Sequence, residues 1–223
     1  MKTKRTYTYA VLNQKGGVGK TTVAVSLAAA AHLGGNRALV IDLDPQGSAL
    51  HWYARRDEGS RLAGLVVVAS LKLTTHRLKE MAVGYNFVVI DCPPRLDDLS
   101  VSAAVGADAV VIPVTPGPFD LWATGETLAT LNKADQIREQ LGMAPVKRLF
   151  VVNQADRRTA ISREAEELLQ SHEGGQLVGV IHRRVAFARA SQDGETVMSQ
   201  LLDPSAAAEV SSLYEQCGLA VAA

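Results

Sequence analysis

The sequence has few of the features that mark a secreted, metal-stapled or membrane-spanning protein. Its only two cysteines, Cys92 and Cys217, lie far apart without metal-ligand spacing, which is typical of a reduced, cytoplasmic protein. No run approaches the roughly 20 apolar residues of a membrane-spanning helix, and the apolar run after the polar start is too short for a signal peptide. Net charge is absent too, because 23 Lys and Arg balance 23 Asp and Glu. A nucleic-acid or membrane surface would therefore need a local cluster of charge.

Short apolar runs alternate with helical patterns along the whole chain. Each run is continuous rather than alternating, as in strands that are buried on both faces. The expected strands are 7–12, 38–41, 65–68, 87–90, 109–114, 149–152 and 177–181, and the longer expected helices are 21–33, 121–141 and 162–171. This order predicts an α/β fold, a mostly parallel twisted sheet with helices on both faces. No repeat or linker interrupts it, so we expect one domain over residues 1–223.

A glycine-rich segment, Asn13–Thr22, follows the first expected strand and opens the first expected helix. Glycines allow backbone N–H groups to converge on phosphate oxygens, and the helix N-terminus adds partial positive charge. Lys20 can reach the β- and γ-phosphates, and the Thr21 hydroxyl can ligate Mg²⁺. The alternative is a plain glycine-rich turn. The expected nucleotide contacts are Gly16, Gly17, Val18, Gly19, Lys20, Thr21 and Thr22.

The run Lys-Gly-Gly-Val-Gly-Lys-Thr-Thr resembles the deviant Walker A motif of the ParA/MinD ATPases, and the chain as a whole is most similar to short ParA partition proteins. A standard loop has Gly where this chain has Gln14. The resemblance implies a P-loop NTPase fold, ATP and Mg²⁺ as cofactors, and an ATP-bound homodimer. It also implies that Lys15 crosses to the partner's nucleotide and assists catalysis, as an arginine finger does. Composition alone would leave Lys15 a solvated loop lysine.

Three aspartates follow two of the buried strands. Acids at the carboxyl ends of parallel strands point into the ligand crevice. The stretch Asp42–Ser48 resembles the family's Asp-x-Asp-Pro-Gln segment, which implies that Asp44 positions the attacking water and that Asp42 lies near Mg²⁺; an Asp-Pro turn is the plainer interpretation. Asp91 ends an apolar run, as a Walker B aspartate does, and is the other expected metal contact. Cys92 beside it is expected to be a small buried residue.

Two later segments match the family more loosely. Residues 112–118 resemble the proline-rich turn of short ParA proteins, and Asn153 follows a late strand, where relatives use an amide to read adenine. Capping of the strand end is the other interpretation of Asn153.

The tail has an apolar helical face, Val210, Leu213, Tyr214 and Cys217, with Glu209 and Glu215 among its charges. Anionic lipid repels an acidic helix, so we expect a packing helix rather than the basic membrane helix of MinD-like proteins. Few residues precede the first strand, so we expect no N-terminal helix-turn-helix domain. Two isolated cysteines also argue against a nitrogenase-type iron–sulfur cluster.

The segment 182–189 contains Arg183, Arg184 and Arg189 and no acid. It resembles the region with which ParA relatives contact DNA, although a solvated surface loop has the same composition. Arg157, Arg158 and residues 147–148 are candidates to extend this surface.

The sequence thus predicts a cytoplasmic, nucleoid-associated Mg-dependent ATPase of the plasmid-partition type. It would position DNA or another large cargo by binding duplex DNA nonspecifically, and a ParB-like adaptor would stimulate hydrolysis. No membrane contact is expected. A MinD-like membrane-associated regulator and a metabolic ATPase are the alternatives.

Overall fold

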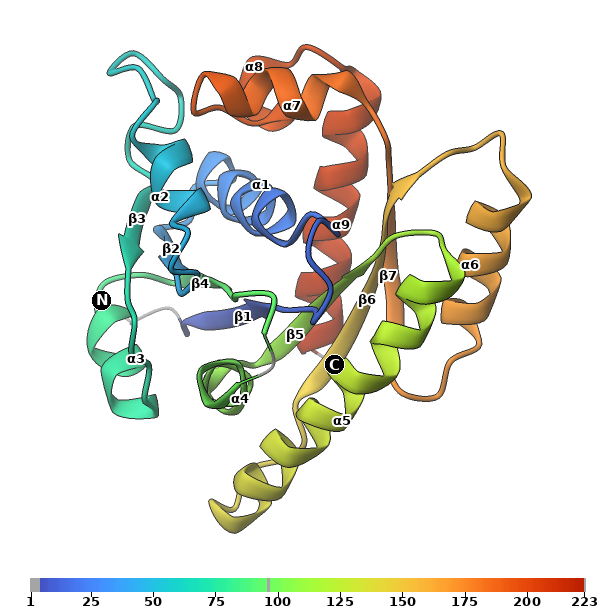
Figure 1. Ribbon diagram of the computed structural model, residues 1–223. Helices are drawn as coiled ribbons and strands as arrows, with labels where there is room; N and C mark the ends of the chain where they lie inside the picture. Colours follow the sequence, from blue (N-terminus) through green and yellow to red (C-terminus); the bar gives the residue numbers. More distant parts are fainter. Residues whose placement is uncertain (1–4, 96, 223) are drawn as a thin grey trace.

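The computed structural model describes residues 5–95 and 97–222, and a seven-stranded sheet lies at its centre (Figure 1). All of the pairings between neighbouring strands are parallel. The order across the sheet is β3-β2-β4-β1-β5-β6-β7. The strands are β1 (Tyr7–Val11), β2 (Ala38–Asp42), β3 (Val66–Ala69), β4 (Phe87–Asp91), β5 (Ala109–Val114), β6 (Lys147–Ala155) and β7 (Gln176–His182).

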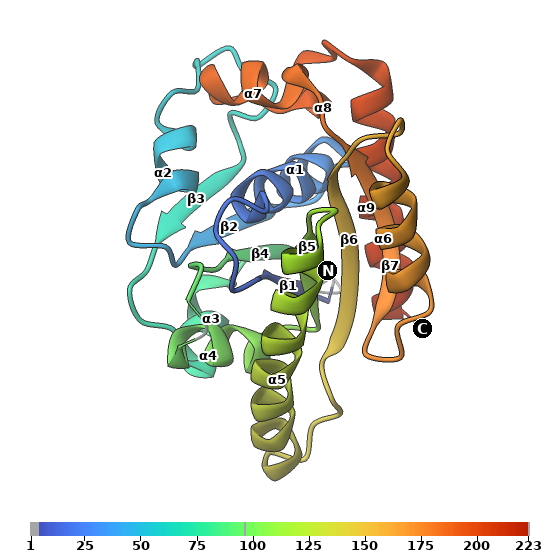
Figure 2. The ribbon, with the colours of Figure 1, turned by 45° about the vertical axis from the view of Figure 1, so that its right-hand side comes forward.

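Helices cover both faces of the sheet (Figures 1 and 2). One apolar core lies under α1, α2 and α9, and the other lies under α3, α4, α5 and α6, while α7 and α8 sit beyond α1. The helices are α1 (Lys20–Leu33), α2 (Ser48–Tyr53), α3 (Thr75–Met81), α4 (Asp98–Gly106), α5 (Pro118–Gln140), α6 (Ala160–Gln170), α7 (Val185–Gln192), α8 (Val197–Gln200) and α9 (Pro204–Ala222).

The continuous apolar runs form the strands for the expected reason. Every residue of β2, β4 and β5 is buried, because helices cover both faces. The alanine-rich α1 packs against the sheet with ten buried residues. It ends before Gly34, and Gly35 adopts the left-handed conformation (φ 82°) that terminates helices.

The predicted fold class is confirmed, and so are all seven predicted strands, with small differences in their bounds. The three predicted longer helices are also present, each beginning one to three residues earlier than expected. Helices α2, α3, α4, α7 and α8 were not predicted, because elements of four to nine residues carry too little periodicity.

The C-terminal helix is a packing helix, as predicted. Its residues Val210, Leu213 and Cys217 are buried, and α9 contacts both β7 and α1. Its apolar face is thus used inside the molecule.

Candidate nucleotide site

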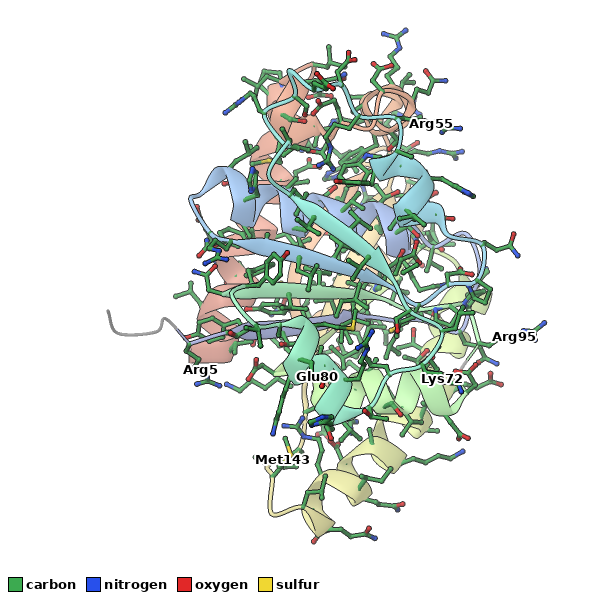
Figure 3. The ribbon with its side chains drawn as sticks, turned by 90° about the vertical axis from the view of Figure 1, so that its left-hand side faces the viewer. Arg5, Arg55, Lys72, Glu80, Arg95 and Met143 are labelled. Atoms are coloured by element: carbon green, nitrogen blue, oxygen red, sulfur yellow. The ribbon has the colours of Figure 1, made fainter. Side chains whose placement is uncertain are left out.

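The three strands that precede the predicted site residues end side by side. In the sheet, Val11 of β1 pairs with Asp91 of β4, which pairs in turn with Asp42 of β2. Figure 3 shows the direction of the strands: Arg5 lies near where they begin, and Arg95 lies at the opposite edge. The phosphate loop and the two aspartates therefore share the carboxyl edge, where open α/β sheets bind ligands.

The loop after β1 has the backbone geometry of an anion site. Gly17 and Gly19 have φ values of 79° and 85°, a left-handed conformation that side chains disfavour. Helix α1 begins directly after Gly19, and no side chain caps it. Its first N–H groups, together with the helix dipole, therefore remain available to a phosphate.

The predicted phosphate lysine lies folded onto the loop. Lys20 is buried, and its Nζ donates to the carbonyl oxygen of Lys15 at 2.9 Å. Burial lowers the pKa of Lys20, whereas the nearby Asp91, Cys92 and Asp44 oppose that shift. A buried ammonium bonded to one backbone carbonyl has donors left for phosphate oxygens.

Asp91 is the most unusual polar group of the site. It is 1% exposed, and neither of its carboxylate oxygens has a hydrogen-bond partner. Burial raises its pKa to about 7, although the neighbouring Thr21 hydroxyl and Lys20 pull it downward. A buried carboxylate without partners is costly unless a cation completes it. Asp91 with Thr21 thus fits Mg²⁺, which would neutralise phosphate charge during transfer.

Asp42 accepts hydrogen bonds from the turn that contains Asp44. One oxygen of the buried Asp42 accepts from the N–H of Asp44 and the other from the N–H of Leu50, both at 3.0 Å. Burial raises the pKa of Asp42 against these bonds. Asp44 lies half-buried, and its Oδ1 accepts from the N–H of Gln46 at 2.9 Å. The metal contact of Asp42 and the water-positioning role of Asp44 remain predictions.

Two amides from β6 hold the phosphate loop. Asn153 Nδ2 donates to the carbonyl oxygen of Val18 at 2.7 Å, and Gln154 Nε2 donates to that of Gly17 at 2.9 Å. The amide N–H group of Asn153 thus supports the loop, and a contact between Asn153 and adenine stays a prediction. Gln154 was missed, and its only sequence signal is its place directly after Asn153.

Asn13 was missed as well, although it is fully buried. Its Nδ2 donates to the carbonyl oxygen of Pro113 at 2.8 Å, and its Oδ1 accepts from the N–H of Lys15 at 3.0 Å. It ties the loop to β5. Lys15 and Thr22 lie half-buried, and their predicted roles toward nucleotide stay predictions.

The segment 182–189 was expected to present three arginines without an acid to neutralise them, and this expectation is wrong for Arg184. Its guanidinium donates to both carboxylate oxygens of Glu209 and also pairs with Asp203 at 3.2 Å. Glu209 comes from α9, which the sequence places outside the segment. Arg183 and Arg189 are exposed, so they remain the candidates for DNA contact.

A cavity of about 1110 Å³ lies at the other edge of the sheet. Its walls include Thr6, Leu78, Val105 and Met143, and no phosphate-loop residue lines it. Met143 appears on the same side as Arg5 in Figure 3. The cavity is therefore separate from the nucleotide site.

Within 5–95 and 97–222, no group of three or more His, Cys, Asp and Glu side chains is arranged to hold a metal ion. No helix in that part of the chain has the length and apolarity needed to cross a membrane.

Comparisons with known proteins agree with this geometry. A carboxysome-distribution protein A of Halothiobacillus neapolitanus is 33% identical over 201 residues, covering 88% of this chain and 89% of the relative. The chromosome-partitioning ATPase Soj of Thermus thermophilus is 35% identical over 218 residues, covering 84% and 86%.

Solved structures share the fold. Apo McdA from Cyanothece has a TM-score of 0.78 at 18% identity, covering 96% of this chain and 100% of that one. A Borrelia burgdorferi plasmid partition protein bound to AMPPNP has a TM-score of 0.71 at 19% identity, covering 96% and 99%. The profile of the CobQ/CobB/MinD/ParA nucleotide binding domain matches residues 9–197. The chain therefore belongs to the ParA/MinD family of ATPases, which use ATP and Mg²⁺.

Proposed function

We propose that this ATPase forms an ATP-dependent homodimer that positions DNA or another large cargo. The dimer binds duplex DNA nonspecifically, and a ParB-like adaptor stimulates hydrolysis and resets it. Residues 1–223 act as one unit, cytoplasmic and associated with the nucleoid. In this proposal Asp42, Asp91 and Thr21 hold Mg²⁺, and Asp44 orients the attacking water.

The observation that carries the proposal is the presence of two lysines on one phosphate loop. Lys20 folds back onto its own loop through the Lys15 carbonyl, so it serves the nucleotide bound in the same subunit. Lys15 lies half-buried at the loop's start. A second cation supplied across a dimer would make dimerisation depend on the γ-phosphate.

Relatives of similar identity support two kinds of cargo. One is named for carboxysome distribution and the other for chromosome partitioning. Both activities place a large body inside a cell, and the choice between them belongs to the adaptor rather than to the nucleotide site.

The membrane alternative has less support. A membrane helix needs an apolar face turned outward, whereas Val210, Leu213 and Cys217 of α9 are buried against the rest of the molecule.

The test uses two variants, one at Lys15 in the phosphate loop and one at Asp44. Asp44→Ala is expected to bind ATP, hydrolyse it slowly and accumulate as a dimer, because water positioning is lost while phosphate contacts persist. Lys15→Gln is expected to bind nucleotide yet remain a monomer. Light scattering after size exclusion with ATP or ADP measures both. Lys133→Gln, at an exposed position of α5, is the matched control.

If Lys15→Gln dimerises and hydrolyses ATP normally, Lys15 has no role across the dimer, and the proposal of a dimer that depends on Lys15 is wrong. Cosedimentation of the ATP-bound protein with DNA or with anionic liposomes then separates the two kinds of surface. Binding to liposomes but not to DNA would favour the MinD-like alternative.

A further inference from the structure

The end of β6 departs from a regular strand beside the phosphate loop. Asn153 pairs with Ile181 of β7, and Ala155 pairs with the next residue, His182, so Gln154 is an extra residue in the ladder. Gln154 also has a φ of 58°, which is uncommon for a residue with a side chain. These are the features of a β-bulge, a device often found next to active sites.

The bulge changes where two consecutive side chains point. In a regular strand, neighbouring side chains point to opposite faces of the sheet. Here both Asn153 and Gln154 reach the same loop, across the intervening strand β5, and donate to the carbonyls of Val18 and Gly17. The contact is tight, since a Cβ at Gly19 would lie 2.3 Å from Asn153 Nδ2.

Holding a carbonyl also fixes the N–H group on the other side of the same peptide bond. No peptide bond in the described residues is cis, and in a trans peptide the C=O and the following N–H point in opposite directions. When β6 holds the Gly17 carbonyl, the N–H of Val18 points away from β6. When it holds the Val18 carbonyl, the N–H of Gly19 does the same.

We propose that Gln154 is a positioning residue which, with Asn153, orients the N–H groups of Val18 and Gly19 toward the phosphates of ATP. The left-handed backbone of Gln154 is retained because it delivers the second amide. The proposal rests on phosphate binding by the loop and assigns β6 a function before any base is bound.

The experiment removes the donor while keeping the shape of the side chain. Gln154→Met is neutral and similar in length but cannot donate to Gly17. Dissociation constants for Mg-ATP come from calorimetry, and inhibition constants for inorganic triphosphate come from its competition with ATP. Triphosphate has no base, so it separates loop orientation from adenine reading. Gln170→Met, at an exposed end of α6, is the matched control.

We expect Gln154→Met to lower the affinities for ATP and for triphosphate by the same factor, about 5- to 10-fold for one lost hydrogen bond. The nucleotide-free melting temperature should stay close to that of wild type. Asn153→Leu, which is neutral, keeps the branched shape and removes the donor, should weaken the binding of both ligands in parallel too. Gln154→Gly, which relieves the backbone conformation and also removes the amide, provides a second test if Gln154→Met folds poorly.

Two results would overturn the proposal. In one, both Gln154 variants bind both ligands as wild type does. In the other, the variants bind ATP more weakly but bind triphosphate as wild type does. The amides would then contact the base rather than position the loop. A Lys20→Ala variant that still binds ATP would instead show that the phosphate-loop assignment itself is at fault.

Discussion

The nucleotide edge and the arginine segment both contain charged residues, but these charges are paired to different extents. At the nucleotide edge, Asp91 is buried with both oxygens unpaired and α1 begins without a side-chain cap. At the arginine segment, Glu209 accepts from Arg157, Arg184 and the backbone N–H of His182. The first region thus has a buried carboxylate without a partner, whereas in the second Glu209 and Arg184 are paired within the protein.

Whether a buried charged group has a partner in the protein therefore distinguishes ligand sites from structural charge clusters better than the number of charges does. Buried polar groups are nearly always paired in proteins, so an unpaired buried carboxylate indicates a missing cation. A carboxylate that is already paired with two arginines and a histidine stabilises the fold and has little capacity left to bind a partner. The comparison predicts that substitutions at the first region change ligand binding, and that Arg184 changes stability.

Lys20→Ala should have the largest effect. It removes the buried ammonium that faces the phosphates, and truncating one member of a buried charged pair costs about 2 to 5 kcal/mol. ATP affinity should therefore fall by about 30-fold or more. Calorimetry with Mg-ATP measures the loss, and Lys133→Ala at an exposed site is the control. Unchanged affinity in Lys20→Ala would show that the loop does not bind phosphate.

Asp91→Asn should make the nucleotide-free protein more stable while abolishing Mg-dependent hydrolysis. Burial raises the pKa of Asp91 from 3.8 to about 7, so the folded state binds more protons than the unfolded state between these values. The free energy of unfolding must then decrease as pH rises from about 4 to 7. This loss amounts to at most about 4 kcal/mol.

Urea denaturation at several pH values measures the effect. The free energy of unfolding of Asp91→Asn should not decrease over this pH range. The variant should therefore exceed wild type in stability most above pH 7 and equal it near pH 4. Asp57→Asn, at an exposed aspartate, is the control. Parallel pH profiles of wild type and Asp91→Asn would mean that ionisation of the buried Asp91 does not destabilise the fold.

Arg184→Ala should destabilise the fold without weakening ATP binding. Burial alone would raise the pKa of Glu209, but hydrogen bonds from Arg184 and His182 hold it below its usual value. Without Arg184, the half-buried acids Glu209 and Asp203 lose their main cation, at a cost of about 2 to 4 kcal/mol. Because the pKa of Glu209 is lowered in the fold, this contribution exists above about pH 4.5 and disappears on acidification.

Thermal unfolding at pH 7 and pH 4 compares Arg184→Ala with Arg183→Ala, one position away and exposed. Arg183→Ala should change stability by no more than about 0.5 kcal/mol. Equal losses in the two variants would contradict the assignment of Arg184 to the fold.

The common position of the phosphate loop and the strand-end aspartates could be predicted because the sequence signals there are local. The loop Asn13–Thr22 lies between one strand and one helix, and Asp42 and Asp91 each end an apolar run. The interactions that were missed join distant positions. Glu209 lies 25 residues from Arg184, and Asn153 lies 135 residues from Val18. The β6 bulge also escaped prediction, since a left-handed Gln154 has no composition signal.

DNA binding tests the arginine segment directly. With Arg184 paired internally, Arg183 and Arg189 are the arginines of this segment that we expect to contact phosphates. Each phosphate contact contributes about −0.9 to the slope of log affinity against log salt, and a dimer presents the pair twice. The double change to Ala should therefore flatten the slope by at most about 3.6, equally for any DNA sequence.

The matched control removes two cations from α3, Arg77 and Lys79, since α3 and α7 lie at opposite sides of the molecule (Figure 1). Salt titrations of DNA affinity with ATP compare both double variants with wild type, and ATP binding should be unchanged in each. If the α3 variant flattens the slope instead, DNA lies on the other face of the sheet. If the slope of the Arg183 and Arg189 variant equals that of wild type, the segment belongs to the fold alone, as Arg184 does, and the difference between the two regions becomes complete.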